Sequence, residues 1–287
     1  MRPVPATAIV TDSTASLPPD LAAARGITVV PLQVIIGATS YTEGVDVTPA
    51  DIAEALGAFN PVNTSRPSPE ALARVYAGLA GDGATEIVSV HLSAEVSGTF
   101  ESAGIAARNA PVPVHCVDSR QVGMGTGFAA LTAADLRDDG AAAGDVAAGA
   151  RERGERATAL FYVDTLEYLR RGGRVGAAAA LVGSALAVKP LLTVRDGRIG
   201  PLEKVRTSSR ALSRLADLAE ERFAACEHGA DVAVQHLANE DRARTMADDL
   251  RRRLALDDVP VSEVGAVIGA HVGPGMLAVT VAGRVGR

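Results

Sequence analysis

Aromatic side chains are scarce in this chain of 287 residues, and tryptophan is absent. Phenylalanine and tyrosine together make up only 3% of the sequence. Nucleic-acid surfaces that stack bases depend on exposed aromatic faces, and sugar-binding platforms use them in the same way. The composition therefore argues against both kinds of surface.

Cysteine and long apolar runs are also scarce. The two cysteines, Cys116 and Cys226, lie far apart, so we expect reduced thiols in a cytoplasm and no disulfide framework. Residues 1–6 lack the apolar stretch and cleavage site of a signal peptide. The longest uncharged run of small and apolar residues, 176–188, is shorter than the roughly 18 residues that span a bilayer. The sequence therefore predicts a cytoplasmic protein.

Length and charge narrow the possible classes of protein further. Hydrophobic residues make up 47% and charged residues 22% of the chain, as in ordinary globular proteins. The length of 287 residues exceeds one typical compact domain and fits two domains that share a cleft. A net charge of -6 gives the protein no general attraction to nucleic acid, so we expect no nucleic-acid partner.

Short β-branched runs alternate with alanine-rich helical patterns in the first half of the chain. Strands are predicted at residues 7–11, 28–36, 86–92, 112–117 and 159–163, and helices at residues 18–25, 48–56, 69–80, 97–108, 127–137 and 142–155. Such alternation is typical of an α/β domain with a mostly parallel sheet flanked by helices.

A second α/β unit is predicted to begin near Thr158. Its strands are predicted at residues 188–194, 198–202, 231–236, 261–268 and 277–281, and its helices at residues 208–225 and 240–254. Asp196-Gly197 signals a hairpin, so this second sheet is expected to be mixed. We therefore predict an N-terminal domain of residues 1–157 and a C-terminal domain of residues 158–287.

Common catalytic motifs are missing. Neither Lys189 nor Lys204 follows a glycine, so the chain has no P-loop, and it has no G-x-S-x-G nucleophile elbow. No cysteine or histidine cluster has zinc-binding spacing. The glycines at positions 123, 125 and 127 lack the third glycine of a dinucleotide fingerprint, and we interpret them as a tight turn before a helix.

Three hydroxyl-rich segments follow predicted strands or precede predicted helices. They are residues 12–14, 63–68 and 93–99. In parallel α/β sheets, ligands bind beyond the carboxyl ends of strands, where free N–H groups of helix N-termini accept anions. Helix capping explains any one of these segments equally well. Two interpretations therefore stay open, helix caps or a polar site for a small anion.

Two basic side chains lie in glycine-rich surroundings. His271 stands between Gly269 and Gly275, which predicts a constrained loop with close backbone approach, and its role is either structural or part of a site. Arg170 belongs to a Leu-Arg-Arg-Gly-Gly-Arg segment that has the basic residues and glycine of a helix C-terminus.

Taken in order, these motifs resemble the DegV family over nearly the whole chain. The segments that carry the resemblance are Val10-Thr11-Asp12-Ser13-Thr14, Thr64-Ser65-Arg66-Pro67-Ser68, His91-Leu92-Ser93 with Ser97-Gly98-Thr99, Asp118-Ser119-Arg120, residues 166–174, Lys189-Pro190-Leu191 with Asp196-Gly197, Lys204-Val205-Arg206-Thr207, and His271 with Gly273-Pro274-Gly275. Each segment is weak alone, but eight in the correct order make a specific match.

The resemblance implies a two-domain α/β fold with a long-chain fatty acid in a tunnel between the domains. It also implies a protein that is not itself an enzyme and has no cofactor. Such a protein is the acyl-binding partner of a separate bacterial fatty acid kinase, which phosphorylates the bound carboxylate to an acyl phosphate for phospholipid synthesis. Transient membrane contact for lipid exchange fits this role.

Functional residues follow from the same resemblance. It places the carboxylate-binding hydroxyls on Thr64 with Ser65 and on the segment from Ser93 to Ser97, without deciding between these two serines. It places the nearby histidine on His271. It assigns the arginine that couples the protein to the kinase to position 170. Two positions depart from the common pattern: Arg66 replaces a frequent glutamine and Ala278 a frequent glycine.

Two alternative functions remain compatible with the sequence. A stand-alone hydrolase would use Ser93 or Ser97 with His271 and would require a serine–histidine hydrogen bond and an oxyanion hole. A fatty-acid-responsive regulatory protein would bind the same ligand without a kinase. Acyl chain preference, the identity of the kinase and the oligomeric state are not encoded in any pattern that we recognise.

Overall fold

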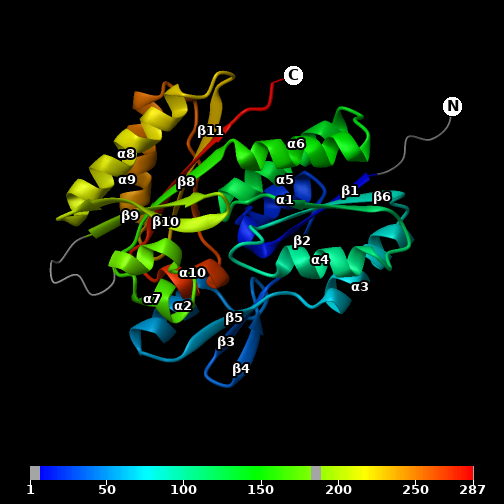
Figure 1. Cartoon of the computed structure of the whole chain (residues 1–287), viewed down its shortest axis with the longest axis horizontal. Helices are drawn as coiled ribbons and strands as arrows, with labels where there is room; N and C mark the ends of the chain where they lie inside the picture. The colour runs from blue at the N-terminus through cyan, green and yellow to red at the C-terminus, as the bar shows by residue number, and fades with distance from the viewer. Residues whose placement is uncertain (1–6, 182–188, 287) are drawn as a thin grey trace.

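The computed structural model describes residues 7–181 and 189–286 (Figure 1). Its strands are β1 (Thr7–Asp12), β2 (Ile27–Val30), β3 (Gln33–Ile36), β4 (Thr39–Thr42), β5 (Val62–Ser65), β6 (Glu86–His91), β7 (Val114–Asp118), β8 (Ala157–Tyr162), β9 (Lys189–Arg195), β10 (Arg198–Val205), β11 (Ala230–His236), β12 (Val261–Glu263) and β13 (Leu277–Gly283). Its helices are η1 (Ser13–Ala15), α1 (Pro19–Ala24), α2 (Pro49–Gly57), α3 (Pro69–Gly81), α4 (Thr99–Ala107), α5 (Met124–Asp138), α6 (Ala143–Glu155), α7 (Glu167–Arg171), η2 (Gly176–Leu181), α8 (Ser208–Ala224), α9 (Glu240–Arg253) and α10 (Ala266–Val272).

The first sheet is parallel, with strand order β2-β1-β6-β7. Helices α5 and α6 cover one face and α3 and α4 the other (Figure 1). Successive side chains of a strand point to opposite faces, so Ile9 packs with Ala129 and Ala147, whereas Val10 packs with Leu72 and Ala103. Burial on both faces explains why consecutive residues at the centres of these strands, such as Ile9 and Val10, are apolar.

The second sheet has six strands in the order β10-β9-β8-β13-β11-β12. Its neighbours are antiparallel except β11 and β12, which are parallel. Helices α8 and α9 cover one face, where Leu215 and Leu250 pack with Leu160. The opposite face carries Phe161 and Ala278 and points away from these helices. The predicted α/β class, with a parallel N-terminal sheet and a mixed C-terminal sheet, is confirmed.

The predicted hairpin turn between β9 and β10 is also confirmed. Asp196 and Gly197 both have positive φ angles, 52° and 79°, as a type I′ turn requires. Pairing continues through Arg195↔Arg198, directly beside the turn. For the strand predicted at residues 188–194, the structure has β9 at Lys189–Arg195, and position 188 lies outside the described residues.

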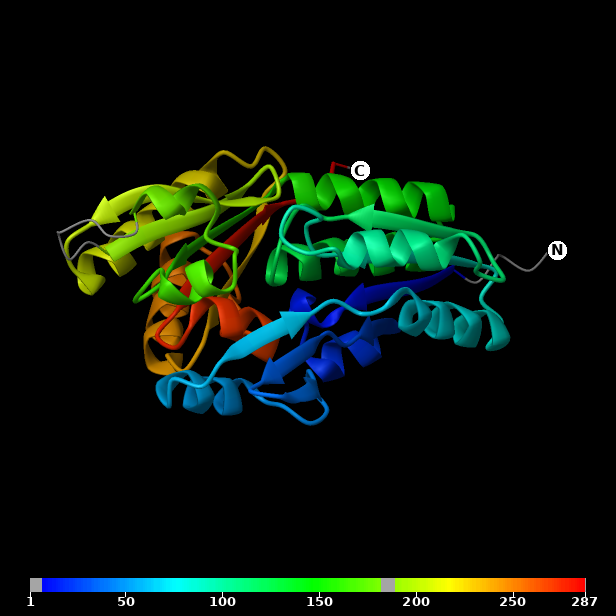
Figure 2. The same cartoon turned by 60° about the horizontal axis from the view of Figure 1, so that its bottom comes forward.

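A third sheet, with strand order β4-β3-β5, was not predicted from the sequence. Its residues were predicted partly as one strand over 28–36, which the structure divides between β2 in the first sheet and β3 in the third. Pro31 stands between them and has no N–H to donate to a ladder, which favours a break there. The third sheet packs beside α2 and α10 (Figure 2).

The strand predicted at residues 261–268 was wrong beyond Glu263. The chain instead turns at Gly265 and forms α10, so His271 lies in the last turn of a helix and not in a loop. The buried Glu43 from the third sheet region accepts a hydrogen bond from the Val267 N–H at 2.7 Å, which satisfies a free donor of the first helical turn. A short apolar run does not distinguish strand from helix, and a distant contact decides it here.

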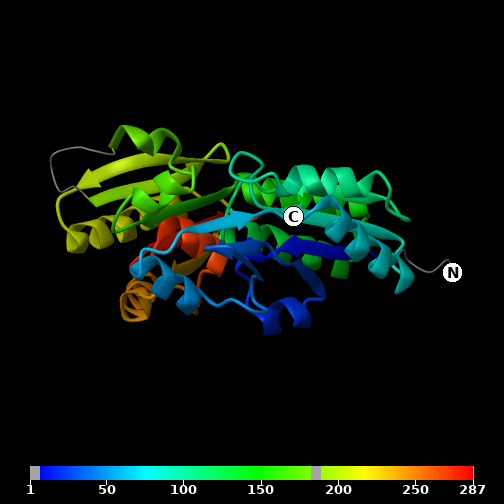
Figure 3. The same ribbon diagram turned by 90° about the horizontal axis from the view of Figure 1, so that it is seen from below.

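In the sequence, the first sheet ends with β7 at Asp118 and the second begins with β8 at Ala157, and Figure 3 shows the two sheets side by side along the long axis. The third sheet precedes this position but packs on α10 from the C-terminal half. The division into domains 1–157 and 158–287 stays a prediction. In the two described segments, no helix is long and apolar enough to cross a membrane. Most of the apolar run 176–188 lies outside these segments.

Candidate functional site

A cavity of about 410 Å³ lies where loops of the first sheet, the third sheet and α10 meet the uncovered face of the second sheet. Its volume falls within the roughly 300–1,000 Å³ of small-molecule sites. We call it the main cavity. Most of its wall is apolar, with Phe161 and Ala278 from the second sheet, Ile268 from α10, and Leu32 and Val96 from the loops. Such a wall suits a hydrocarbon ligand.

Several polar side chains line the main cavity. Thr64 on β5 and His271 on α10 share a hydrogen bond of 2.8 Å between Oγ1 and Nε2. The other ring nitrogen of His271, Nδ1, is buried, has no hydrogen-bond partner among the described residues and faces Gly172. A side chain at position 172 would collide with the imidazole, so this close approach requires glycine.

Arg174 is another polar side chain of the cavity wall. Its guanidinium donates from Nη1 to the Gly172 carbonyl at 2.6 Å and from Nε to the Val96 carbonyl at 3.1 Å. The helix end turns back through Gly173, with φ at 72°, and this turn places Arg174 against the cavity. Neutral carbonyls leave its positive charge uncompensated, since no carboxylate pairs with Arg174 in the described part of the chain.

Ser97 also lines the main cavity, next to the residue that binds Arg174. Its hydroxyl shares a 2.9 Å hydrogen bond with Thr99. We call Thr64, Ser97, Arg174 and His271 the polar cluster. Four parts of the chain that are far apart in the sequence, β5, the loop before α4, the segment after α7 and α10, bring these four side chains to one cavity.

The imidazole of His271 is neutral at pH 7. Burial, together with the positive charge of Arg174, lowers the pKa of His271 from its ordinary value of 6.5 to about 4, and burial is the larger cause. A neutral imidazole and a threonine hydroxyl can both donate and accept hydrogen bonds. The polar cluster therefore offers one fixed positive charge together with adjustable donors, which suits an anionic group.

Three predicted site residues lie elsewhere than the polar cluster. Ser93 is fully buried, is not part of the cavity wall, and donates its hydroxyl to the Gly197 carbonyl at 2.7 Å. Ser65 lines the cavity, but its hydroxyl donates to the Arg66 carbonyl at 3.3 Å. Arg170 is exposed and donates to both carboxylate oxygens of Glu167 at 2.8 Å.

Arg66, which stands where the family frequently has glutamine, lies at the cavity wall. Its Nη1 donates to Glu101 at 2.8 Å and to the Gly98 carbonyl at 3.0 Å, so an acid neutralises much of its positive charge. Arg174, which the sequence analysis treated only as the end of a helix cap, is the cavity's unpaired cation. Its position directly after Gly172 and Gly173 was the sequence feature that could have identified Arg174 as a site residue.

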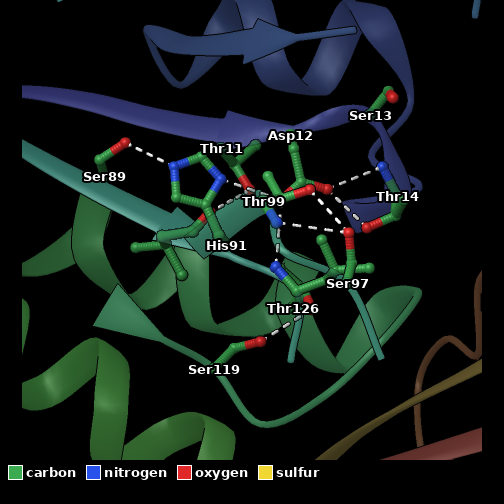
Figure 4. A network of polar contacts seen from close by, with 12 residues as sticks. Thr11, Asp12, Ser13, Thr14, Ser89, His91, Ser97, Thr99, Ser119 and Thr126 are labelled. Atoms are coloured by element: carbon green, nitrogen blue, oxygen red, sulfur yellow. Dashed lines mark hydrogen bonds and ion pairs between the residues drawn. The ribbon is translucent and has the colours of Figure 1, made fainter. Parts of the chain in front are cut away.

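A second histidine lies in a buried network behind the cavity wall (Figure 4). His91 Nε2 contacts Ser89 Oγ at 2.8 Å and His91 Nδ1 contacts Asp12 Oδ2 at 3.0 Å, which is the geometry of a serine–histidine–aspartate triad. All three side chains are fully buried, and Tyr76 donates to Ser89 at 2.9 Å. No substrate reaches this serine, so the network is structural.

The same network fixes two loops of the main cavity. Asp12 accepts hydrogen bonds from the backbone N–H of Thr14 at 3.1 Å and of Leu92 at 3.0 Å. Thr14 and Leu92 both line the cavity. Asp12 therefore caps the turn after β1, as the capping interpretation predicted, and joins it to the end of β6.

Hydrolase chemistry lacks its required contact in this arrangement. His271 bonds to Thr64, whereas Ser93 bonds to Gly197 and Ser97 to Thr99. No carboxylate orients the imidazole, because Nδ1 has no partner in residues 7–181 and 189–286. Within these residues, no group of three or more His, Cys, Asp or Glu side chains could hold a metal ion.

Comparisons with known proteins agree with this architecture. The family model described as "Uncharacterised protein, DegV family" matches residues 6–284. A DegV domain-containing protein of Streptomyces coelicolor is 53% identical over 278 residues, which cover 96% of this chain and 98% of that protein. A DegV domain-containing protein of Deinococcus radiodurans is 39% identical, with 95% and 96% covered.

Two solved structures are similar over nearly their whole length. They are a DegV family protein of Thermus thermophilus, described as binding fatty acid, and DegV of Bacillus subtilis, described as a fatty acid binding protein. Each has a TM-score of 0.88 and 32% sequence identity, and the alignment covers 97% of this chain and 99% of the other. The sequence match and the shared fold lead to the same conclusion: this chain belongs to the DegV family.

Proposed function

We propose that this protein binds one long-chain fatty acid of roughly 14 to 18 carbons in the main cavity, with the carboxylate at the polar cluster. The observation that carries the proposal is an apolar cavity with one uncompensated cation, Arg174, at its wall. The two relatives described as fatty acid binding proteins support the same ligand class. We propose no cofactor besides this ligand.

The free energy gained by burying a long acyl chain favours this ligand. Burying about 14 methylenes at roughly 0.8 kcal/mol each gives on the order of 11 kcal/mol before the costs of association and chain ordering. A bare carboxylate is expensive to bury, and Arg174 with the hydroxyls of Thr64 and Ser97 supplies the charge and donors that it needs. Ser97 is the better candidate than Ser93 for this contact, because only Ser97 reaches the cavity.

The ionisation of His271 tests this placement. A carboxylate within about 4–6 Å of an imidazole favours its protonated form. Fatty acid binding is therefore expected to raise the pKa of His271 above its value of about 4 in the free protein. NMR titration of the histidine ring with and without palmitate measures the shift, and mass spectrometry of lipid extracted from the purified protein identifies the natural ligand.

The NMR titration has an internal control and two results that would contradict the proposal. Buried His91 lies outside the cavity wall and serves as the internal control, because its resonances are expected to stay unchanged on addition of palmitate. A His271 pKa that does not rise on saturation with palmitate would place the carboxylate elsewhere. Protein that carries no lipid and binds none on titration would refute fatty acid binding itself.

We further propose that the protein presents the carboxylate to a separate fatty acid kinase in the cytoplasm. The absence of a P-loop in the sequence supports a division of labour between the two proteins. The hydroxyls and the single arginine bind the carboxylate without a metal, which leaves an oxygen free for phosphoryl transfer. The isolated chain is therefore expected to form no acyl phosphate from ATP. A fatty-acid-responsive regulator would share the ligand but would need no kinase.

Arg170 is the proposed kinase contact. It is exposed on α7, the helix that leads to Arg174, and its known partner is Glu167 on the same helix. Arg170→Ala is expected to leave fatty acid affinity unchanged and to lower the rate of acyl phosphate formation by the cognate kinase about tenfold or more, because charged contacts at interfaces are worth more than exposed ion pairs. A coupled kinase assay measures this rate.

Arg242→Ala is the matched control, because Arg242 is an exposed arginine on α9. Its phosphorylation rate is expected to equal that of the wild type. An equal rate for Arg170→Ala would leave Arg170 with only its bond to Glu167, as a helix-stabilising pair.

Transient membrane contact is proposed at Phe59. This side chain is 82% exposed and follows α2, beside the third sheet that carries Thr64. Aromatic side chains bind well at the membrane interface, so Phe59→Ser is expected to slow fatty acid transfer from lipid vesicles several-fold without changing equilibrium affinity. A fluorescence transfer assay measures the rate, and Ile105→Ser on α4 is the control for an exposed apolar residue elsewhere.

A further inference from the structure

A second concavity opens inside the six-stranded sheet, where β8 and β9 diverge. Their recorded pairing ends at Leu160↔Thr193, although β8 begins at Ala157 and β9 continues to Arg195. Both strands remain paired on their outer sides, β8 with β13 as far as Ala157 and β9 with β10 as far as Arg195. The divergence is therefore a gap between well-anchored strands and not the fraying of a free end.

Side chains form hydrogen bonds to backbone carbonyls at the base of this gap. Thr193 donates its hydroxyl to the Ala159 carbonyl at 2.9 Å. Gln121, from the loop after β7, donates its amide to the carbonyls of Ala157 at 2.9 Å and Gly154 at 3.2 Å. These bonds replace the missing strand pairing on the β8 side and hold the gap at a fixed width. The remaining volume, about 240 Å³, is open to solvent.

Three arginines from three separate elements line this second concavity. Arg120 follows β7, Arg195 ends β9 and Arg222 lies in the last turn of α8. Arg120 contacts Asp196 at 3.4 Å, whereas Arg195 and Arg222 have no ion-pair partner among the described residues. Glu155 is the other acid in the wall, so the concavity carries three positive and two negative groups on a chain of net charge -6.

We propose that this concavity, the Arg pocket, binds a small anion through a phosphate group. Guanidinium groups bind phosphate through paired N–H donors, and two of the three arginines here have donors without acidic partners. The hydroxyl of Thr158 on the β8 side adds a further polar contact. The ligand is inorganic phosphate or a small phosphate monoester.

The wall of the Arg pocket excludes larger phosphate ligands. Among the described residues, its wall contains no aromatic side chain on which a nucleobase could stack. Its volume of about 240 Å³ lies below the usual range for drug-sized ligands. None of its wall residues belongs to the wall of the main cavity, so occupation of the two sites is separable.

Isothermal titration of the full chain with inorganic phosphate, at low ionic strength, tests the proposal. The wild type is expected to show saturable binding of one phosphate. Arg195→Gln and Arg222→Gln are each expected to weaken it about tenfold or more, because each removes a charged hydrogen-bonding group. A second titration with glycerol 3-phosphate distinguishes the sources, since tighter binding than inorganic phosphate identifies a monoester as the preferred ligand.

Arg210→Gln is the matched control, because Arg210 is an exposed arginine on the same helix as Arg222 but outside the Arg pocket. Its phosphate affinity is expected to equal that of the wild type. Absence of saturable binding in the wild type up to about 10 mM phosphate overturns the proposal. An equal loss in Arg210→Gln also overturns it, because the binding would then reflect general surface charge. Either result leaves fatty acid binding untouched.

Discussion

Ala278→Phe is expected to lower the fatty acid affinity of this protein by at least about a hundredfold. Ala278 lies on β13, and its small side chain forms part of the main cavity wall. A phenyl ring at this position would occupy space that we assign to the acyl chain. Displacing about four methylenes, at roughly 0.8 kcal/mol each, costs on the order of 3 kcal/mol of binding free energy.

Equilibrium titration with a fluorescent fatty acid measures this loss, and the melting temperature shows whether the variant folds. Ala278→Ser is the control for a polar change without added bulk, and its affinity is expected to stay within a few-fold of the wild type. Ala278→Gly enlarges the cavity and is expected to favour a longer chain. An unchanged affinity of folded Ala278→Phe would mean that the acyl chain lies outside the main cavity.

The sequence predicted the strands of the two large sheets well because burial makes their patterns simple. β1 and β6 are buried along almost their whole length and have β-branched apolar centres, and the predicted segments differ from the observed strands by only one residue. β4 could not be recognised in the same way. Its four residues, Thr39–Thr42, are polar or partly exposed and show no alternation, so its only signal is tertiary pairing with β3.

For the functional residues, too, tertiary contacts decide what the local sequence pattern leaves open. Ser93 and Ser97 are equivalent in a local pattern, and the contact of Ser93 with Gly197, 104 positions away, separates them. Arg170 and Arg174 lie on one basic segment, yet only the turn at Gly173 directs Arg174 to the cavity. A motif identifies the segment that carries a site, whereas distant backbone contacts decide which side chain reaches it.

Arg174→Gln is expected to weaken fatty acid binding between about ten- and a hundredfold. A hydrogen bond to a charged group contributes about 1.5–3 kcal/mol, and the carboxylate would lose the positive charge of Arg174, which no carboxylate neutralises in the described residues. Glutamine retains a donor and most of the side-chain length, so the change tests charge more than packing. Arg170→Gln is the matched control, because Arg170 is outside the cavity wall and its affinity is expected to be unchanged.

The pKa of His271 in the ligand-free protein gives a second test of the role of Arg174. Burial and, to a smaller extent, the charge of Arg174 together lower the pKa of His271 to about 4. Removing that charge is therefore expected to raise the pKa of His271 in the free Arg174→Gln variant, whereas Arg170→Gln leaves it unchanged. A variant with a raised His271 pKa and an unchanged fatty acid affinity would show that Arg174 reaches the imidazole but not the carboxylate. That result would move the carboxylate to another part of the cavity wall, while loss of affinity together with the raised pKa would place all three groups at one end of the acyl chain.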